Sequence, residues 1–257
     1  MSGFLGFVAE QYTHLPLIDP PADVEKSTYI VTGANTGLGY ECAKHLIEFG
    51  AARVIIAIRS VEKGNAALAR LRKETGRASA GEVWELDLAS LDSVEKFAKR
   101  VNGLDRIDAI IENAGVALLE FTKVDDIEMS LMVNVLATML LAFRVLPKLK
   151  ESAKKFNIQP RLVIVSSGTG LYPMLKGKLD NVEDNLFQTM SRPGMMDFRY
   201  ILLFLQIPTK SPFPYHSASS DLFRRVDIPS QNKWKFTLFA SSHLCSLYPR
   251  PELSSTS

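Results

Sequence analysis

The sequence predicts an α/β protein built on a doubly wound parallel sheet that is incomplete at its C-terminal end. Three observations support this fold class. Short apolar, β-branched runs alternate with helix-length segments along the first two thirds of the chain. A turn with three glycines joins the first run to the first helical segment. The later runs end in polar residues, and parallel strands bring such ends together at one edge of the sheet.

Composition narrows the class of protein. The 257 residues suffice for one α/β domain with a sizeable core. Hydrophobic residues make up 46% and charged residues 23%, as in ordinary globular proteins. The net charge is +2 and the basic residues are scattered, which argues against nucleic acid as a partner. Two cysteines, Cys42 and Cys245, make no disulfide framework and fit a reducing compartment.

The N-terminal residues and the apolar runs suggest a location. No uninterrupted apolar run approaches the roughly 18 residues that span a bilayer, so we expect no membrane span. The apolar segment 4–9 is too short for a signal peptide and has no basic residue before it. We therefore expect a cytoplasmic protein. Residues 1–26, which include Pro16, Pro20 and Pro21, predict an irregular N-terminal arm.

The glycine turn lies between a predicted strand at 29–32 and a predicted helix at 40–49. Gly33 permits a tight exit from the strand, Gly37 leaves room for a phosphate at the backbone N–H groups, and Gly39 lets the helix pack closely. The N-terminus of the helix adds unpaired N–H groups and the positive end of its dipole. For three glycines alone, an ordinary βα turn without a ligand is the alternative.

Further strands and helices alternate after this unit. Strands are predicted at 53–58, 82–87, 107–111 and 161–165, and helices at 61–75, 90–102 and 125–150. The β-branched run 53–58 is typical of a strand buried on both faces of a parallel sheet. Ser90 is expected to cap the helix that follows it. Apolar residues at helical spacing on 125–150 are interpreted as core or helix–helix packing.

Two cations follow the second predicted strand. An acidic residue there would bind the ribose 2′-hydroxyl of NAD, but the position holds Arg59, and Lys63 follows one turn into the next helix. Cations near that ribose suit the 2′-phosphate of NADP. The alternative is that both side chains are simply solvated. Asn134 lies inside a predicted helix, where a buried Asn needs hydrogen-bond partners, and this suggests a role in a site.

The spacing Thr-Gly-x3-Gly-x-Gly at 32–39 resembles the fingerprint of the short-chain dehydrogenase/reductase family. The resemblance runs to about Arg199 and implies a Rossmann-like fold with NADP bound at the glycine turn, Leu38 included. It implies that Asp87 contacts the adenine of the cofactor. The alternative is that Asp87 only begins the next helix. It also implies that Asn113, in Asn-Ala-Gly, shapes the strand edge beside the cofactor.

The same resemblance implies three catalytic residues. Ser167, or Ser166 as the second choice, would hydrogen-bond the substrate carbonyl oxygen while hydride arrives. Tyr200 would donate the proton, because segment 195–200 resembles the approach to the family's Tyr-x-x-x-Lys motif in fungal, retinol-dehydrogenase-like members. Asn134 would support the catalytic lysine through water.

Beyond Tyr200 the sequence departs from the family. Phe204 stands where the motif has Lys, so the tyrosine lacks the ammonium that makes it an acid–base group at neutral pH. Lys210 lies beyond Pro208, which disfavours one continuous helix. Residues 201–257 show no sixth and seventh family strands and predict an irregular tail, that is, an aberrant or truncated C-terminal third.

Within that tail, the alternating segment 233–239 is either a strand or an incidental apolar stretch. If the tail does not cover it, the strand at 161–165 becomes an exposed apolar edge. Family members commonly dimerise through the helix that bears Tyr-x-x-x-Lys, so the resemblance implies a homodimer, whereas the altered C-terminal region argues against one. The Glu112 position commonly holds Asn in the family, which is a mild departure.

Two functions follow from these observations. The first is an NADP-dependent oxidoreductase formed by residues 27–200 that interconverts a carbonyl and an alcohol. Its small-molecule substrate would be lipophilic or polyketide-like, as in fungal secondary metabolism, and no metal is implied. The alternative is a catalytically impaired NADP-binding or interaction protein that lacks the lysine. A nucleotide-sugar epimerase, which also uses Tyr-x-x-x-Lys, is a weaker third option.

Overall fold

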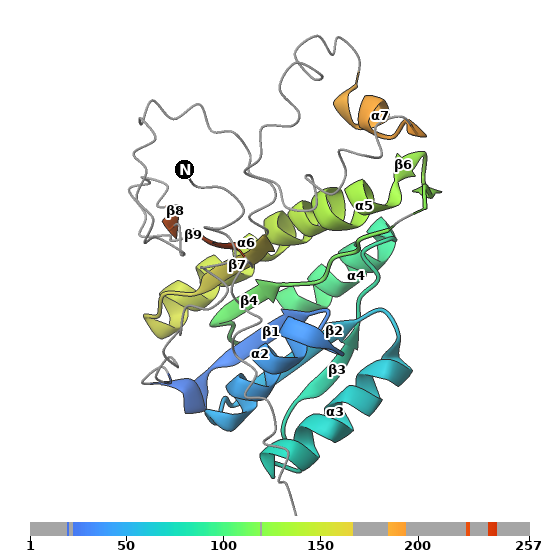
Figure 1. Cartoon of the computed structure of the whole chain (residues 1–257). Coiled ribbons are helices and arrows are strands. Elements are labelled where there is room, and N and C mark those ends of the chain that lie inside the picture. Colours follow the sequence, from blue (N-terminus) through green and yellow to red (C-terminus); the bar gives the residue numbers. More distant parts are fainter. Residues whose placement is uncertain are drawn as a thin grey trace, which may run out of the picture.

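A central sheet organises the part of the chain that the structure, a computed structural model, describes: residues 20, 23–118, 120–166, 185–193, 225–226 and 236–240. The sheet has seven strands in the order β3-β2-β1-β4-β7-β9-β8 (Figure 1). Their bounds are β1 Thr28–Thr32, β2 Arg53–Ile58, β3 Glu82–Glu85, β4 Ala109–Glu112, β7 Arg161–Ser166, β8 Arg225–Val226 and β9 Phe236–Ala240. Only β8 runs antiparallel to its neighbour. The predicted doubly wound parallel sheet is confirmed.

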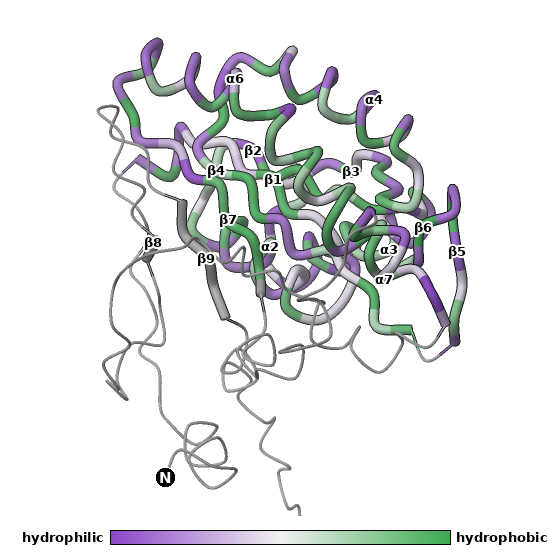
Figure 2. The backbone as a smooth tube through the Cα atoms, turned by 90° about the horizontal axis from the view of Figure 1, so that it is seen from above, coloured by the Kyte–Doolittle hydropathy of each residue, from purple (hydrophilic) through white to green (hydrophobic). Residues whose placement is uncertain are grey.

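Helices cover both faces of this sheet. Helices α2 (Gly37–Glu48) and α3 (Val61–Thr75) lie on one face, and α4 (Leu91–Asn102) and α6 (Thr138–Phe156) lie on the other (Figure 2). Neighbouring residues of β1 point to opposite cores: Ile30 packs with the α4–α6 side and Val31 with the α2–α3 side. Both are fully buried, which explains why the strands read as continuous apolar runs.

The helix ends follow local sequence signals. Ser90 caps α4 as predicted, since its Oγ accepts a hydrogen bond from the backbone N–H of Ser93 at 3.3 Å. Ser60 caps α3 in the same way, accepting from the Lys63 N–H. Gly76 closes α3 with a φ of 68°, the left-handed conformation that glycine adopts without steric cost.

The long helix predicted at 125–150 begins later than expected. A hairpin of β5 (Lys123–Val124) and β6 (Ile127–Glu128) occupies its predicted start, and the two residues between these strands have φ values of 48° and 62°. Both are Asp, which tolerates the left-handed region that such two-residue turns require. The predicted start was therefore wrong.

The helix itself begins at Met129 and is continuous through α5 (Met129–Leu131), η2 (Met132–Ala137) and α6. Its middle section, η2, is a π-helix. By length and composition alone these 28 residues could span a membrane, but 56% of the most apolar window is buried inside the protein. The apolar spacing was predicted to serve packing, and Met132 and Val133 are indeed buried, whereas Phe143 is 62% exposed.

Strand β9 covers the outer edge of β7. It lies parallel to β7, with Leu162 opposite Phe236 and Ser166 opposite Ala240. Strand β8 then pairs with the other side of β9. The structure thus places two strands within the range 201–257, for which an irregular tail was expected, and one of them overlaps the alternating segment 233–239. Because β9 is paired to it, β7 is not the exposed edge of the sheet.

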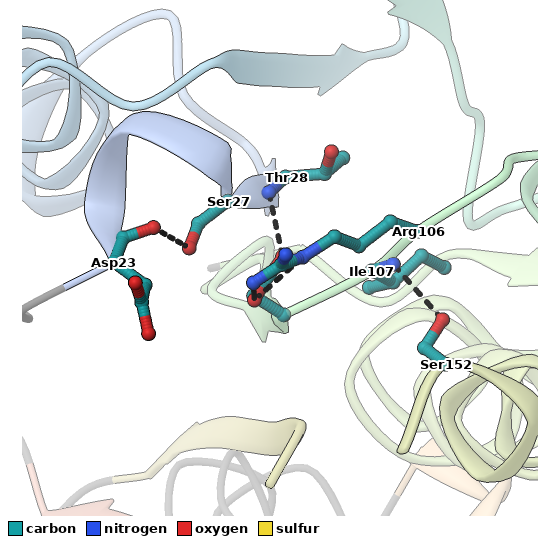
Figure 3. A network of polar contacts seen from close by, with 7 residues as sticks. Asp23, Ser27, Thr28, Arg106, Ile107 and Ser152 are labelled. Carbon is teal, nitrogen blue, oxygen red and sulfur yellow. Dashed lines mark hydrogen bonds and ion pairs between the residues drawn. The ribbon is translucent and has the colours of Figure 1, made fainter. Parts of the chain in front are cut away.

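A polar network holds the opposite end of the sheet, where β1 begins (Figure 3). The Asp108 carboxylate accepts a hydrogen bond from the Thr28 N–H at 2.8 Å and pairs with the guanidinium of Arg106 at 2.6 Å. The neighbouring Ile107 N–H donates to Ser152 Oγ of α6 at 3.0 Å. These bonds join β1, the segment before β4 and α6, so they fix the strands whose other ends form the site described next.

Candidate cofactor-binding site

The glycine turn lies where the order of strands reverses direction. Strands β2 and β4 flank β1 on its two sides, and ligands of doubly wound sheets bind at the carboxyl end of the strands at such a point. The turn follows β1 directly, and Arg59 and Asn113 follow β2 and β4. Asp87 comes shortly after β3, so the parallel pairing brings all these predicted residues to one edge.

Two of the three glycines are required by close packing. Gly33 has a φ of +67°, and a Cβ atom there would lie 2.9 Å from the Ala114 Cα atom. A Cβ atom on Gly39 would lie 2.5 Å from the Asn113 Nδ2 atom and 2.7 Å from the Gly33 carbonyl oxygen. These distances are too short for any side chain, so the turn and the start of α2 rest directly on the segment after β4.

Gly37 is different because the space beside it is open. Its φ is +60°, and a Cβ atom there would meet no atom of the described residues within 4 Å. It is the first residue of α2, and the side chain of Thr36 before it makes no capping hydrogen bond within the described part of the chain. Together with the half-buried Leu38, Gly37 therefore presents backbone N–H groups beside open space, which fits a phosphate.

Thr32 and Asn113 join the ends of β1 and β4. The Thr32 Oγ1 atom accepts hydrogen bonds from the N–H groups of Asn113 at 3.0 Å and Ala114 at 2.9 Å. In return, Asn113 Nδ2 donates to the carbonyl oxygens of Thr32 at 3.1 Å and Gly33 at 3.4 Å. Asn113 was predicted to shape this edge, but the role of Thr32 was missed. Its signal was a hydroxyl at the last position of a buried strand.

Replacing Thr32 with Val is expected to lower the free energy of unfolding by about 2 kcal/mol, since two N–H groups lose their acceptor. Thr32→Ser keeps the oxygen and loses one methyl group, which costs about 1 kcal/mol. Urea unfolding followed by circular dichroism measures both. Equal losses in the two variants would show that the hydroxyl has no such role.

Asn134 lies in the π-helix η2 and has the partners that its position requires. Its Oδ1 atom accepts from the Val116 N–H, and its Nδ2 atom donates to the Val116 carbonyl oxygen, both at 2.8 Å. The side chain thus ties the segment after β4 to the helix. Ser166 ends β7 at the same edge of the sheet, whereas Ser167, Tyr200 and Phe204 lie outside the residues that the structure describes. Their catalytic roles stay predictions.

Asp87 is engaged in the turn before α4. Its Oδ1 atom accepts from the Ala89 N–H at 3.0 Å, and its own N–H donates to Ser93 Oγ at 2.9 Å. This is the helix-start arrangement that the sequence left as the alternative. The contact with an adenine stays a prediction.

The two predicted cations occupy different surroundings. Arg59 is exposed just after β2, and Lys63 is exposed in the first turn of α3. Lys63 lines a cleft of about 400 Å³ between the glycine turn and α3. The described residues that line this cleft are Asn35, Thr36, Lys63, Ala66, Ala67 and Arg70.

Glu112 is a buried carboxyl group at the last position of β4. Neither carboxyl oxygen has a hydrogen-bond partner within the described part of the chain, and the residue is 3% exposed. Burial raises the pKa of the Glu112 carboxyl well above its ordinary value. Alternation along β4 places it on the face of Ile110, toward α4 and α6. Burial therefore favours the protonated form of this carboxyl group, which lies beside Asn113 with no polar partner among the described residues.

Residues 27–178 match the family model described as short chain dehydrogenase. The chain belongs to the short-chain dehydrogenase family. The match covers the glycine turn, β4 with Asn113, the helix with Asn134 and β7, which are the elements that form the edge described above. Cys42 lies in α2, where burial raises the pKa of its thiol to about 11 and makes it a poor nucleophile.

Curated relatives of this chain include three fungal proteins. It is 41% identical to the short chain dehydrogenase FGM9 of Gibberella zeae, over 65% of this chain and 49% of that protein. It is 37% identical to the short chain dehydrogenase atnD of Emericella nidulans, over 76% of this chain and 62% of that protein. It is also 37% identical to the short chain dehydrogenase sol3 of Alternaria solani, over 82% and 76%. The chain thus spans about half the length of the first of these relatives.

Solved structures share the fold. A short-chain dehydrogenase from Sphingobium yanoikuyae, solved in complex with NADPH, is 24% identical with a TM-score of 0.50, over 68% of this chain and 62% of that one. The bulky-bulky ketone specific alcohol dehydrogenase from Comamonas testosteroni is 19% identical with a TM-score of 0.51, over 69% of this chain and 65% of that one. At these identities the likeness extends to the fold.

Proposed function

We propose that this short-chain dehydrogenase is an NADP-dependent oxidoreductase that interconverts a carbonyl and an alcohol. The observation that carries the proposal is the opening at Gly37, where the first N–H groups of α2 face free space at the reversal point of the sheet. A phosphate of a dinucleotide fits that opening. Membership in a family of dehydrogenases supports the reaction class.

Different residues would hold different parts of the cofactor. Gly33, Gly37, Leu38 and Gly39 would receive the pyrophosphate through the turn and the helix N-terminus. The bound cofactor supplies or accepts a hydride. An anionic 2′-phosphate at the ribose favours NADP over NAD beside cations, and this chain has Arg59 and Lys63 after β2. Asp87 and Asn113 complete the proposed cofactor site at the ends of β3 and β4.

Two residues would act on the substrate, and a third would position the site. The Ser167 hydroxyl would donate a hydrogen bond to the carbonyl oxygen, and the Tyr200 hydroxyl would deliver the proton to that oxygen. Asn134 would keep the helix and the segment after β4 in place through its two bonds to Val116. Phe204 stands where the family has Lys, so a cation that lowers the tyrosine pKa would have to come from another position.

The substrate class follows from the resemblance to fungal members. We infer a lipophilic or polyketide-like metabolite and a cytoplasmic enzyme formed by residues 27–200. The named relatives come from fungi, which supports that resemblance.

Two measurements test this function. A cofactor that binds only the folded state raises the melting temperature. Titration with NADPH should raise the melting temperature of the purified protein more than titration with NADH, because Arg59 and Lys63 favour the 2′-phosphate. NADPH oxidation over a panel of aliphatic and aromatic ketones should then show turnover, and Ser167→Ala and Tyr200→Phe should each reduce the rate by at least about 10²-fold. If neither NADPH nor NADH bound to the protein, the proposal would be refuted. Binding without turnover would favour the non-catalytic alternative.

A further inference from the structure

The cleft between the glycine turn and α3 has a cation at each end of one wall. Lys63, Ala66, Ala67 and Arg70 are spaced by three and four residues, so they share one face of α3. The two alanines carry only methyl groups between the long cationic side chains. Because both Lys63 and Arg70 line the same volume of about 400 Å³, their charges act on whatever enters it.

The opposite wall belongs to the glycine turn. Asn35 and Thr36 line it with an amide and a hydroxyl group, and Gly37 opens to free space immediately after them. The wall therefore offers polar groups beside the proposed pyrophosphate position. Arg59, which the sequence suggested for the 2′-phosphate, is not one of the described residues lining this cleft.

Arg70 is held in place by α2. Its guanidinium carbon lies 3.8 Å from the centroid of the Tyr40 ring, and Tyr40 is buried at 2% exposure. Its Nε atom lies 3.6 Å from a carboxylate oxygen of Glu74, which also pairs with Lys44 at 3.3 Å. Stacking and this ion pair orient the planar guanidinium. An orientation that is fixed in advance reduces the entropy lost when an anion binds.

We propose that Arg70, together with Lys63, determines the preference for NADP by binding the 2′-phosphate in the cleft between the glycine turn and α3. This inference rests on the proposed function and adds a residue that the sequence did not suggest. An oriented guanidinium and an ammonium on either side of the two alanines match a phosphate dianion, and Asn35 and Thr36 lie across from them. Tyr40 and Glu74 act as positioning residues for Arg70.

The test compares ligands that differ only in that phosphate. Isothermal titration of Arg70→Gln should show about tenfold weaker binding of NADPH and of 2′,5′-ADP than in the unmodified chain, whereas NADH and 5′-AMP bind as before. Arg70→Lys keeps the charge but loses the stacked plane, and an intermediate loss is expected. Lys73→Gln, which removes an exposed charge on the same helix outside the cleft lining, should leave all four affinities unchanged.

The outcomes separate the two proposals. Equal loss of NADPH and NADH affinity in Arg70→Gln would overturn the inference, because the side chain would then support the fold of the site and not the 2′-phosphate. An unchanged NADPH preference would also overturn it, while the proposed function would stand. If the unmodified chain bound neither dinucleotide, the proposed function itself would fail. Competition by inorganic phosphate against NADPH, but not against NADH, would further support the cleft as the anion site.

Discussion

Gly37→Ala is expected to weaken NADPH binding by more than about 100-fold while the protein still folds. A methyl group at this position meets no atom within 4 Å in the part of the chain that the structure describes, so that part has room for it. It would, however, point into the space that the phosphate needs beside the α2 N–H groups. The left-handed φ of +60° adds a cost of about 1 kcal/mol to folding for any residue with a Cβ atom.

Gly76 provides a matched control for the backbone strain. Its φ is +68°, a Cβ atom there also meets no atom within 4 Å among the residues that the structure describes, and it ends α3 at the opposite end from Lys63. Gly76→Ala should therefore lose a similar amount of stability and bind NADPH normally. Thermal unfolding and fluorescence titration of both variants provide the comparison. Normal binding by Gly37→Ala would exclude the turn as the phosphate site.

Glu112→Gln is expected to remove a pH dependence of the protein's stability. The pKa of the buried Glu112 carboxyl is raised, so the folded protein keeps this proton at pH values where the unfolded chain has released it. Its contribution to stability is fully present below the ordinary glutamate pKa of about 4.3. That contribution is lost as the pH rises through the raised pKa of the folded state. The Gln side chain has no proton to lose in this range.

Urea unfolding at a series of pH values from acidic to mildly alkaline measures this effect. The two proteins should have similar stability at the acidic end, and the Gln variant should become the more stable of the two as the pH rises. Glu85→Gln, at an exposed position at the end of β3, should follow the unmodified chain throughout. Parallel curves for Glu112→Gln and the unmodified chain would show that the carboxyl is paired or hydrated in solution.

The sequence predicted the sheet well because its signals are local. The strand at 53–58 and the Ser90 cap each depend only on residues a few positions apart in the sequence, and both are found where expected. The hairpin at 123–128 was missed because its turn uses two Asp residues without the usual glycine, so the segment read as the start of a helix. Asn134 was singled out by its helix-interior position, and its partner Val116 became visible only in three dimensions.

The candidate site was predictable in part for the same reason. The three glycines are visible as a motif, but only the structure separates Gly33 and Gly39, which pack against other atoms, from Gly37, which faces open space. Arg70 lies too far along the chain from the turn to be linked to it by spacing. Its place in the cleft depends on how α3 packs beside α2, which no local pattern specifies.

The pairing of β9 with β7 has a consequence for how the molecule is made. Leu162 and Phe236 are neighbours in the sheet, yet the ribosome must add every residue between them before the two can meet. Contacts of such high sequence separation form slowly, because a long loop must close first. During synthesis the apolar strand β7 therefore has an unpaired edge until β9 has been made. Chaperones bind such exposed edges, so we expect a chaperone to bind the nascent chain at this stage.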